Sequence, residues 1–129
     1  MLDINEFAKE VHQNAKDHGW WNEERSFGDI IALCHSELSE ALEEYRNGYD
    51  PNMIYYSDGT AVQDDSKYDG IGSYTIINQT PEGIPIELAD CVIRIMDMCA
   101  HYGIDLEAAI TEKHEYNKTR PYKHGGKRI

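Results

Sequence analysis

Four segments of the chain place apolar residues at steps of three and four, which is the period of an amphipathic α-helix. The predicted helices span residues 3–18, 26–47, 84–103 and 105–119. Glycine ends many helices, and Gly19 and Gly48 directly follow the first two segments. Two of the three connections between these helices are short, so the pattern predicts an all-α fold, a four-helix bundle.

The helical period disappears between residues 49 and 83, where glycine, aspartate, asparagine and tyrosine dominate. Two β-prone runs, 53–56 and 74–77, flank a polar middle. We therefore expect a long loop or a β-hairpin insertion between the second and third helices. Its apolar and tyrosine content predicts that it packs against another protein surface, which could be a second subunit.

Length and composition indicate one domain, residues 1–129, with the insertion and a basic tail at 120–129. No apolar run is long enough for a membrane span, and the acidic N-terminus does not resemble a secretory signal. The three cysteines lie in helical apolar patterns and are expected to be reduced core residues of a cytoplasmic protein. The net charge of −12 argues against nucleic-acid binding.

Two pairs of acidic residues carry the candidate chemistry: Glu37 and Glu40 on the second helix, and Glu87 and Asp90 on the third. Residues three apart lie on the same side of a helix, so each pair shares a face. A single pair of this kind is usually a solvated acidic face. The third helix, however, is apolar nearly all round, and charges on a core helix need partners or a metal ion. Carboxylates are the ligands that Mg²⁺ prefers, so the two pairs predict a shared magnesium site.

The complete order of motifs resembles the MazG-like all-α nucleoside triphosphate pyrophosphohydrolases. The residues that carry the resemblance are the two acidic pairs, followed by Lys113, Asn117 and Arg120 in the run KHEYNKTR. The likeness covers all four helices. This sequence departs from the family in the 46 residues (87 − 40 − 1) between Glu40 and Glu87, more than is usual there.

The resemblance implies hydrolysis of a nucleoside or deoxynucleoside triphosphate to the monophosphate and pyrophosphate. It implies Mg²⁺, which Mn²⁺ can replace, held by the four acids, and assembly as a homodimer or homotetramer. It further implies that Lys113, Asn117 and Arg120 bind substrate, and that Trp20 or Trp21 stacks on the base. The tryptophans could equally plug one end of the bundle, and Asn117 could cap the last helix.

Charge sets the expected mechanism. At about 4 Å, each unscreened pair of like charges costs roughly 4 kcal/mol with an effective dielectric constant near 20, so a triphosphate needs cations to approach four carboxylates. A water would attack the α-phosphorus in line, with Glu40 or Glu37 helping to take its proton. Lys113 and Arg120 would neutralise the phosphates that leave.

Three other functions compete with this prediction. A non-catalytic acidic helical module that binds a partner protein would share the same composition. A di-iron carboxylate bundle would need Glu-x-x-His pairs, which neither acidic helix has. A P-loop nucleotide site is disfavoured because the motif G-x-x-x-x-G-K-[ST] does not occur in the sequence.

Overall fold

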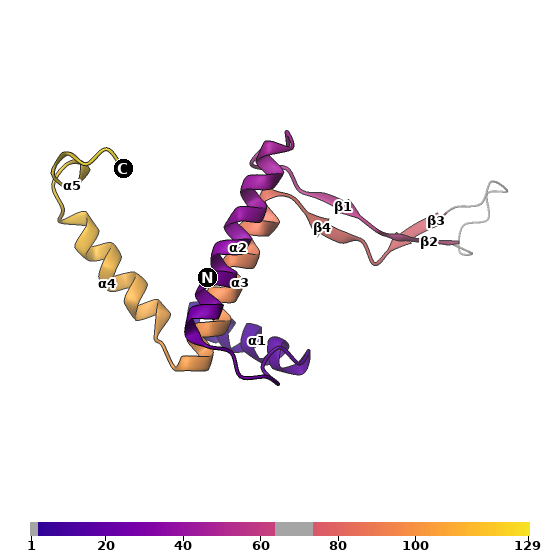
Figure 1. Ribbon diagram of the computed structural model, residues 1–129, viewed down its shortest axis with the longest axis horizontal. Helices are drawn as coiled ribbons and strands as arrows, with labels where there is room; N and C mark the ends of the chain where they lie inside the picture. The colour runs from indigo at the N-terminus through magenta and orange to yellow at the C-terminus, as the bar shows by residue number, and fades with distance from the viewer. Residues whose placement is uncertain (1–2, 64–73) are drawn as a thin grey trace. The chain divides into compact units, whose positions relative to one another are not determined.

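The computed structural model describes residues 3–63 and 74–129, and helices make up most of them (Figure 1). The helices are α1 (Ile4–Asp17), α2 (Phe27–Arg46), α3 (Ile84–Tyr102), α4 (Leu106–Lys118) and the short α5 (Lys123–Gly126). The strands are β1 (Tyr55–Ser57), β2 (Thr60–Gln63), β3 (Tyr74–Ile77) and β4 (Thr80–Glu82). The chain divides into two compact units, each described by itself below: unit 1 holds residues 1–30 and 93–129, and unit 2 holds residues 31–92.

In unit 1, aspartates begin both α1 and α4. The Asp3 carboxylate accepts a hydrogen bond from the Glu6 amide at 3.1 Å, and Asp105 accepts one from the Ala108 amide at 3.0 Å. Each bond satisfies an amide that has no partner within the first turn of its helix. The hydrogen bonds from Asn5 and the Ala108 amide also hold the pKa of Asp105 below its ordinary value.

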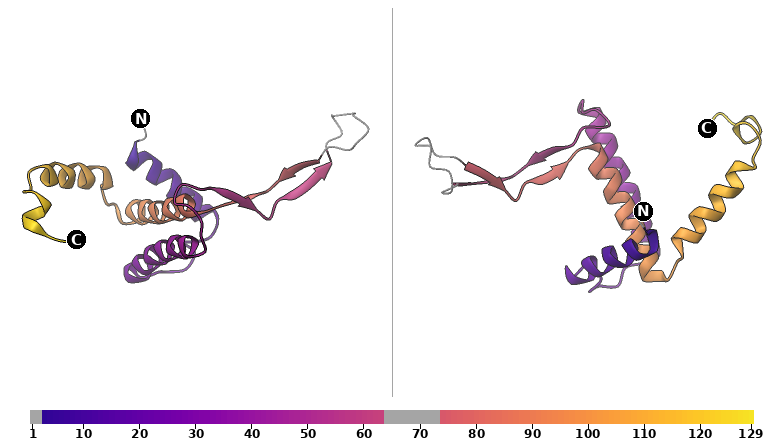
Figure 2. Two further views of the ribbon diagram at one scale, coloured as in Figure 1. Left: turned by 90° about the horizontal axis from the view of Figure 1, so that it is seen from above. Right: turned by 180° about the vertical axis from the view of Figure 1, so that it is seen from behind.

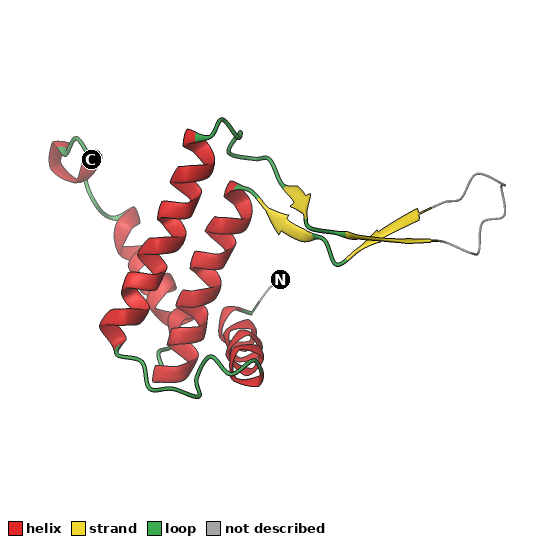
Figure 3. Ribbon diagram, turned by 45° about the vertical axis from the view of Figure 1, so that its right-hand side comes forward, coloured by secondary structure: helices red, strands yellow, loops and turns green. Residues whose placement is uncertain are grey.

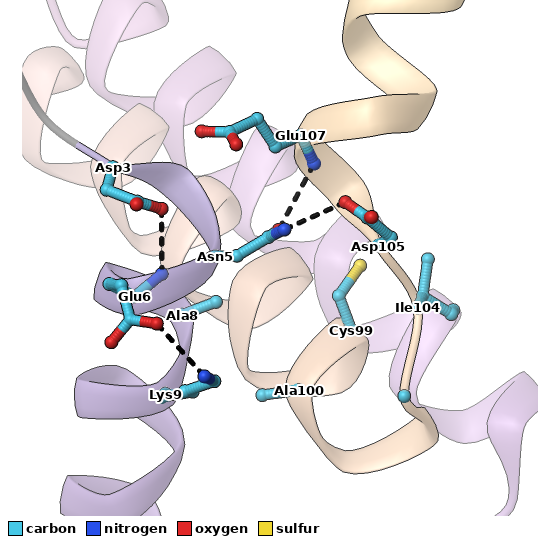
Figure 4. Close-up of a pocket in the computed structure, with 11 residues that line it drawn as sticks. Asp3, Asn5, Glu6, Ala8, Lys9, Cys99, Ala100, Ile104, Asp105 and Glu107 are labelled. Carbon is cyan, nitrogen blue, oxygen red and sulfur yellow. Dashed lines mark hydrogen bonds and ion pairs between the residues drawn. The ribbon is translucent and has the colours of Figure 1, made fainter.

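Asn5 ties the starts of these two helices together. Its side-chain amide donates to the Asp105 carboxylate at 2.8 Å, and its side-chain carbonyl accepts from the Glu107 amide at 3.2 Å (Figure 4). Beside this junction lies a cavity of about 400 Å³. Its wall includes the buried Cys99, whose thiol pKa is raised by burial.

In unit 2, the second half of α2 and the first half of α3 lie side by side and run in opposite directions (Figures 1 and 3). One row of each helix is buried between them, namely Cys34, Glu37 and Ala41 on α2 with Ile84 and Cys91 on α3. The Cys91 thiol donates to the Cys34 carbonyl oxygen at 3.5 Å. A small apolar layer with one glutamate inside it therefore joins the two helices.

The strands form a two-stranded arm that leaves the ends of α2 and α3 (Figure 2). β1 pairs antiparallel with β4, with Tyr56 opposite Pro81, and β2 pairs antiparallel with β3 further along. Between the two ladders, Asp58 and Asn78 take the left-handed conformation, with φ of 56° and 58°. Asp and Asn tolerate left-handed φ and ψ angles better than most residues. They allow the backbone to bend between β1 and β2 and between β3 and β4.

The root of the arm depends on Gly83, which has φ of +115°. A Cβ atom at this position would lie 2.3 Å from the Met53 carbonyl oxygen, far inside van der Waals contact. Only glycine lets the two backbones approach so closely here. The chain therefore turns from β4 into α3 directly against the entry to β1.

The predicted helices are confirmed to within one or two residues at each end, and the insertion is confirmed as a β-hairpin where it is described. The packing of all four helices as one bundle stays a prediction, as does the single domain. The three cysteines are buried thiols and form no disulfide. Within the described residues, no helix has both the length and the apolarity that crossing a bilayer requires.

Candidate metal site on α2 and α3

Three of the four predicted acids converge within unit 2. Ligand atoms of Glu37, Glu87 and Asp90 all lie within 4.8 Å of one another. The arrangement follows from the helical period, because each acidic pair lies beside the row that its helix buries against the other helix. Glu37 itself is only 6% exposed, which is unusual for a carboxylate.

The electrostatics of the cluster are unfavourable without a cation. At about 4.8 Å and an effective dielectric constant of 20, each ionised pair repels by roughly 3 kcal/mol. Burial, a hydrogen bond with Glu40 and the charges of Glu40, Asp90 and Glu37 raise the pKa of Glu87 from 4.5 to about 7. The Glu87 Oε2 atom is buried and has no hydrogen-bond partner among the described residues.

The donor set fits a small divalent cation. Oxygens around an octahedral Mg²⁺ at 2.0–2.1 Å are separated by about 2.9 Å when adjacent and about 4.2 Å when opposite, so the three carboxylates would move closer by up to about 2 Å to share one ion. A cation would remove the repulsion among them and would give the buried Glu87 oxygen a partner. All-oxygen ligation favours Mg²⁺, Ca²⁺ or Mn²⁺ over the softer transition metals.

Glu40 lies at the edge of this cluster instead of in its centre. It is exposed, and its carboxyl group shares a hydrogen bond with Glu87. Two carboxyl groups can share such a bond only when one of them holds a proton, which agrees with the raised pKa of Glu87. Glu87 can therefore accept or release a proton near neutral pH.

Glu44, one turn beyond Glu40, takes no part in the cluster. The Tyr55 hydroxyl donates to both of its carboxylate oxygens, at 2.8 and 2.9 Å, and the Tyr49 ring stacks on Tyr55 at 4.6 Å. The bond to Glu44 raises the pKa of Tyr55 above its ordinary value. Glu44 therefore fixes the base of the arm to α2 through its hydrogen bonds with Tyr55.

The predicted phosphate-binding residues lie on or just after α4 in unit 1, on a helix with no buried side chain. The Lys113 ammonium lies 4.7 Å and the Arg120 guanidinium 5.8 Å from the centre of the Tyr116 ring. The Arg120 amide donates to the Asn117 carbonyl at 3.2 Å, and the Asn117 side chain is exposed. Two cations therefore gather around one aromatic ring, while their role towards substrate stays a prediction.

The two tryptophans differ in their surroundings. Trp20 is 58% exposed, with the Arg25 guanidinium 5.4 Å from its ring centre. The Trp21 ring is stacked on His101 at 3.9 Å, and its N–H donates to the Asp97 carboxylate at 2.9 Å. Base stacking stays a prediction for both, and Trp20 has the more open ring.

The sequence patterns did not reveal a polar cluster around Asp97 in unit 1. His12 Nδ1 lies 2.7 Å from the same carboxylate, and both side chains are largely buried, at 13% and 19% exposed. His12 also meets His101 edge to face at 5.5 Å. The available signal was Asp97, a third acid on the largely apolar helix α3, but its partners lie 76 and 85 residues away along the chain.

Comparison of the chain with known protein families, with curated proteins and with solved structures returns no significant match. The resemblance to the MazG-like enzymes therefore rests on the motif residues and their order alone.

Proposed function

We propose that this protein is a Mg²⁺-dependent nucleoside triphosphate pyrophosphohydrolase. The observation that carries the proposal is the convergence of Glu37, Glu87 and Asp90 within 4.8 Å on two neighbouring helices. Three partly buried carboxylates so close together repel one another when they are ionised. A site that binds a divalent cation, and with it a polyphosphate, explains why they are together.

In this proposal Glu37, Glu87 and Asp90 hold the cation. When bound, Mg²⁺ neutralises phosphate oxygens and makes water more acidic. Glu40 accepts the proton of the attacking water, since it is exposed and hydrogen-bonded to Glu87 at the edge of the cluster. The attack falls on the α-phosphorus, so the products are the nucleoside monophosphate and pyrophosphate.

The basic residues at the end of α4 are the ones that the family resemblance assigns to the phosphates of the substrate. Lys113 and Arg120 carry fixed positive charge that can stabilise the leaving pyrophosphate, and Asn117 can donate to a phosphate or a sugar hydroxyl. Both cations lie near the same Tyr116 ring, so they bring two positive charges to one part of the chain.

The test is an assay of the purified protein with Mg²⁺ and a panel of ribo- and deoxynucleoside triphosphates, with the products separated. Monophosphate plus pyrophosphate supports the proposal, whereas diphosphate plus orthophosphate means that a different bond is cut. Absence of turnover with every nucleotide, together with no Mg²⁺-dependent thermal shift, favours the non-catalytic module.

Two substitutions on α2 sharpen the assay. Glu40→Gln removes the proposed base and is expected to abolish turnover while the protein still binds Mg²⁺. Glu43→Gln is the matched control, because Glu43 makes only an exposed ion pair with Arg46 at 3.8 Å. Full activity in Glu40→Gln would exclude Glu40 as the base.

A further inference from the structure

Unit 1 contains a cavity that uses none of the residues of the candidate metal site. Its volume of about 400 Å³ lies within the range of about 300–1,000 Å³ that is typical of small-molecule sites. Three helices build it: α1 supplies one wall, the start of α4 supplies the opposite wall, and the last turn of α3 lies between them (Figure 4). The cavity is therefore large enough for a small ligand and belongs to one compact unit.

The floor of the cavity is small and apolar, with one polar atom that lacks a partner. Ala8 and Cys99 are 3% and 4% exposed, and Ile104 continues this surface towards α4. Within the described part of the chain the Cys99 thiol makes no hydrogen bond, and its sulfur points toward the space between Asn5 and Asp105 (Figure 4). A buried thiol packs well against methylene groups and is a weak hydrogen-bond acceptor. A ligand with a short apolar body and a donor group would therefore suit this floor.

The rim of the cavity is acidic on both walls. Asp3 and Glu6 belong to the α1 wall, Asp105 and Glu107 belong to the α4 wall, and Lys9 is the one basic residue in the lining (Figure 4). Lys9 is paired with Glu6 at 3.0 Å. Asp3 on one wall and Asp105 and Glu107 on the other make no ion pair within residues 3–63 and 74–129. Each wall therefore presents negative charge that no described cation balances.

The three carboxylates without an ion pair each keep one oxygen available to a ligand. Asp3 and Asp105 cap their helices through Oδ1, and Glu107 accepts the Ile4 amide through Oε1 at 3.4 Å. Their second oxygens accept no hydrogen bond from any described residue. Each of these oxygens can accept a hydrogen bond from an ammonium group, and such charge-assisted bonds are the stronger ones.

The spacing of these acids favours an extended cation over a metal ion. Among the described residues, the acids whose ligand atoms lie within 4.8 Å of one another are Glu37, Glu87 and Asp90, and the lining of this cavity contains no such group of three. Carboxylates on two facing walls above an apolar floor instead complement a short chain with a positive charge at each end. A linear diamine is such a cation, because primary alkylamines, like the lysine side chain, are protonated at neutral pH.

We propose that this cavity binds a small linear diamine or polyamine. Its methylene chain lies on Ala8 and Cys99, one ammonium group binds Asp3, and the other binds Asp105 or Glu107. The lysine side chain of a partner protein carries one charge, so the two acidic walls favour the free diamine. The net charge of −12 attracts such a cation, most strongly at low salt. The site is independent of the proposed hydrolysis of nucleotides.

The test is a titration of the isotope-labelled wild-type chain with putrescine, a linear four-carbon diamine, followed by NMR at constant ionic strength. Saturable shifts are expected at the backbone amides of Ala100, Ile104 and Glu107 up to roughly 10 mM, where a ligand with a millimolar dissociation constant fills most of its sites. Butylamine, with one charge, is expected to bind several-fold more weakly, and n-butanol is expected to cause no saturable shift. Equal binding of butylamine and putrescine, or shifts confined to Glu37 and Glu87, would overturn the proposal.

Two substitutions, followed at the Ile104 amide, locate the ligand. Ala100→Leu fills the cavity from α3 and is expected to abolish putrescine binding, while Ala109→Leu adds the same volume on the exposed surface of α4 as the matched control. Glu107→Gln removes one rim charge and is expected to weaken binding roughly two- to fivefold, the range of an exposed ion pair, whereas Glu112→Gln lies outside the cavity and should leave it unchanged. No saturable shift in the wild type, or a dissociation constant that Glu107→Gln leaves unchanged, overturns the proposal, whether or not the protein hydrolyses nucleotides.

Discussion

Glu87→Gln tests the candidate metal site through stability alone, without any assay of activity. Glutamine has nearly the shape of glutamate but never ionises. In the metal-free protein, the neighbouring carboxylates and burial raise the pKa of Glu87 from 4.5 to about 7. At about 1.4 kcal/mol per pKa unit, ionised Glu87 destabilises the folded state by about 3 kcal/mol.

The direction with pH follows from which state loses its proton first. Below pH 4.5 the Glu87 carboxyl is neutral in both folded and unfolded chains, and its ionisation costs the folded state nothing. Between pH 4.5 and about 7 the unfolded chain ionises first, so the free energy of unfolding falls as pH rises. Above about pH 7, Glu87 is ionised in both states, and its destabilising effect on the folded protein no longer grows with pH.

In EDTA at pH 8, Glu87→Gln is therefore expected to be more stable than the wild type, by up to about 3 kcal/mol or roughly 10 °C in melting temperature. At pH 4.5 the two proteins should have nearly the same free energy of unfolding. Added Mg²⁺ should remove most of this difference at pH 8, since a ligand at 100 times its dissociation constant stabilises the wild type by about 2.7 kcal/mol and the variant has lost a ligand atom.

The free energy of unfolding of both proteins is measured in urea by far-UV circular dichroism, at both pH values and with either EDTA or Mg²⁺. These four conditions give four differences between the variant and the wild type. Glu43→Gln on α2 serves as the control and is expected to stay within about 0.5 kcal/mol of the wild type throughout. Equal stability of Glu87→Gln and wild type in EDTA at pH 8 would refute the reasoning, because it would mean that Glu87 is not held in a repulsive environment.

Three further predictions concern the scaffold. Gly83→Ala should destabilise the protein by about 3 kcal/mol or more, measured in urea, because its Cβ would lie 2.3 Å from the Met53 carbonyl oxygen in a left-handed backbone; an unchanged midpoint would contradict this close approach. His12→Ala should cost about 1–3 kcal/mol in the same experiment by removing a hydrogen bond from the largely buried Asp97, and no loss would mean that the contact is not formed in solution. In an absorbance titration at alkaline pH, the difference between wild type and Tyr55→Phe should show one phenol that ionises later than free tyrosine; ordinary titration would show that its bond to the carboxylate is absent.

The sequence predicts the local structure of this protein well, because its signals are local. Asp3 and Asp105 cap α1 and α4, since a short acidic side chain can reach an amide three residues on. The three-residue spacing of the acids also predicts correctly that Glu37 and Asp90 approach each other, once the two core helices pack side by side.

What the sequence does not predict depends on contacts between distant residues and on the conformations of individual side chains. Asp97 belongs to the same charged stripe of α3 as Glu87, yet it is satisfied by His12 and Trp21 and takes no part in the acidic cluster of unit 2. Glu44 likewise continues the row of Glu40 but binds a tyrosine of the arm. The spacing of acidic residues along a helix does not show which carboxylate belongs to a candidate metal site and which one accepts a hydrogen bond from a tyrosine.

The contact between Gly83 and Met53 fixes the arm where it begins, at the base of both strands. Changes of sequence or length near the far end can therefore vary what the arm touches without moving the helices that carry the acids. The sequence of the arm and the sequence of the helices can accordingly change independently of each other, whereas Gly83 is required where the two meet.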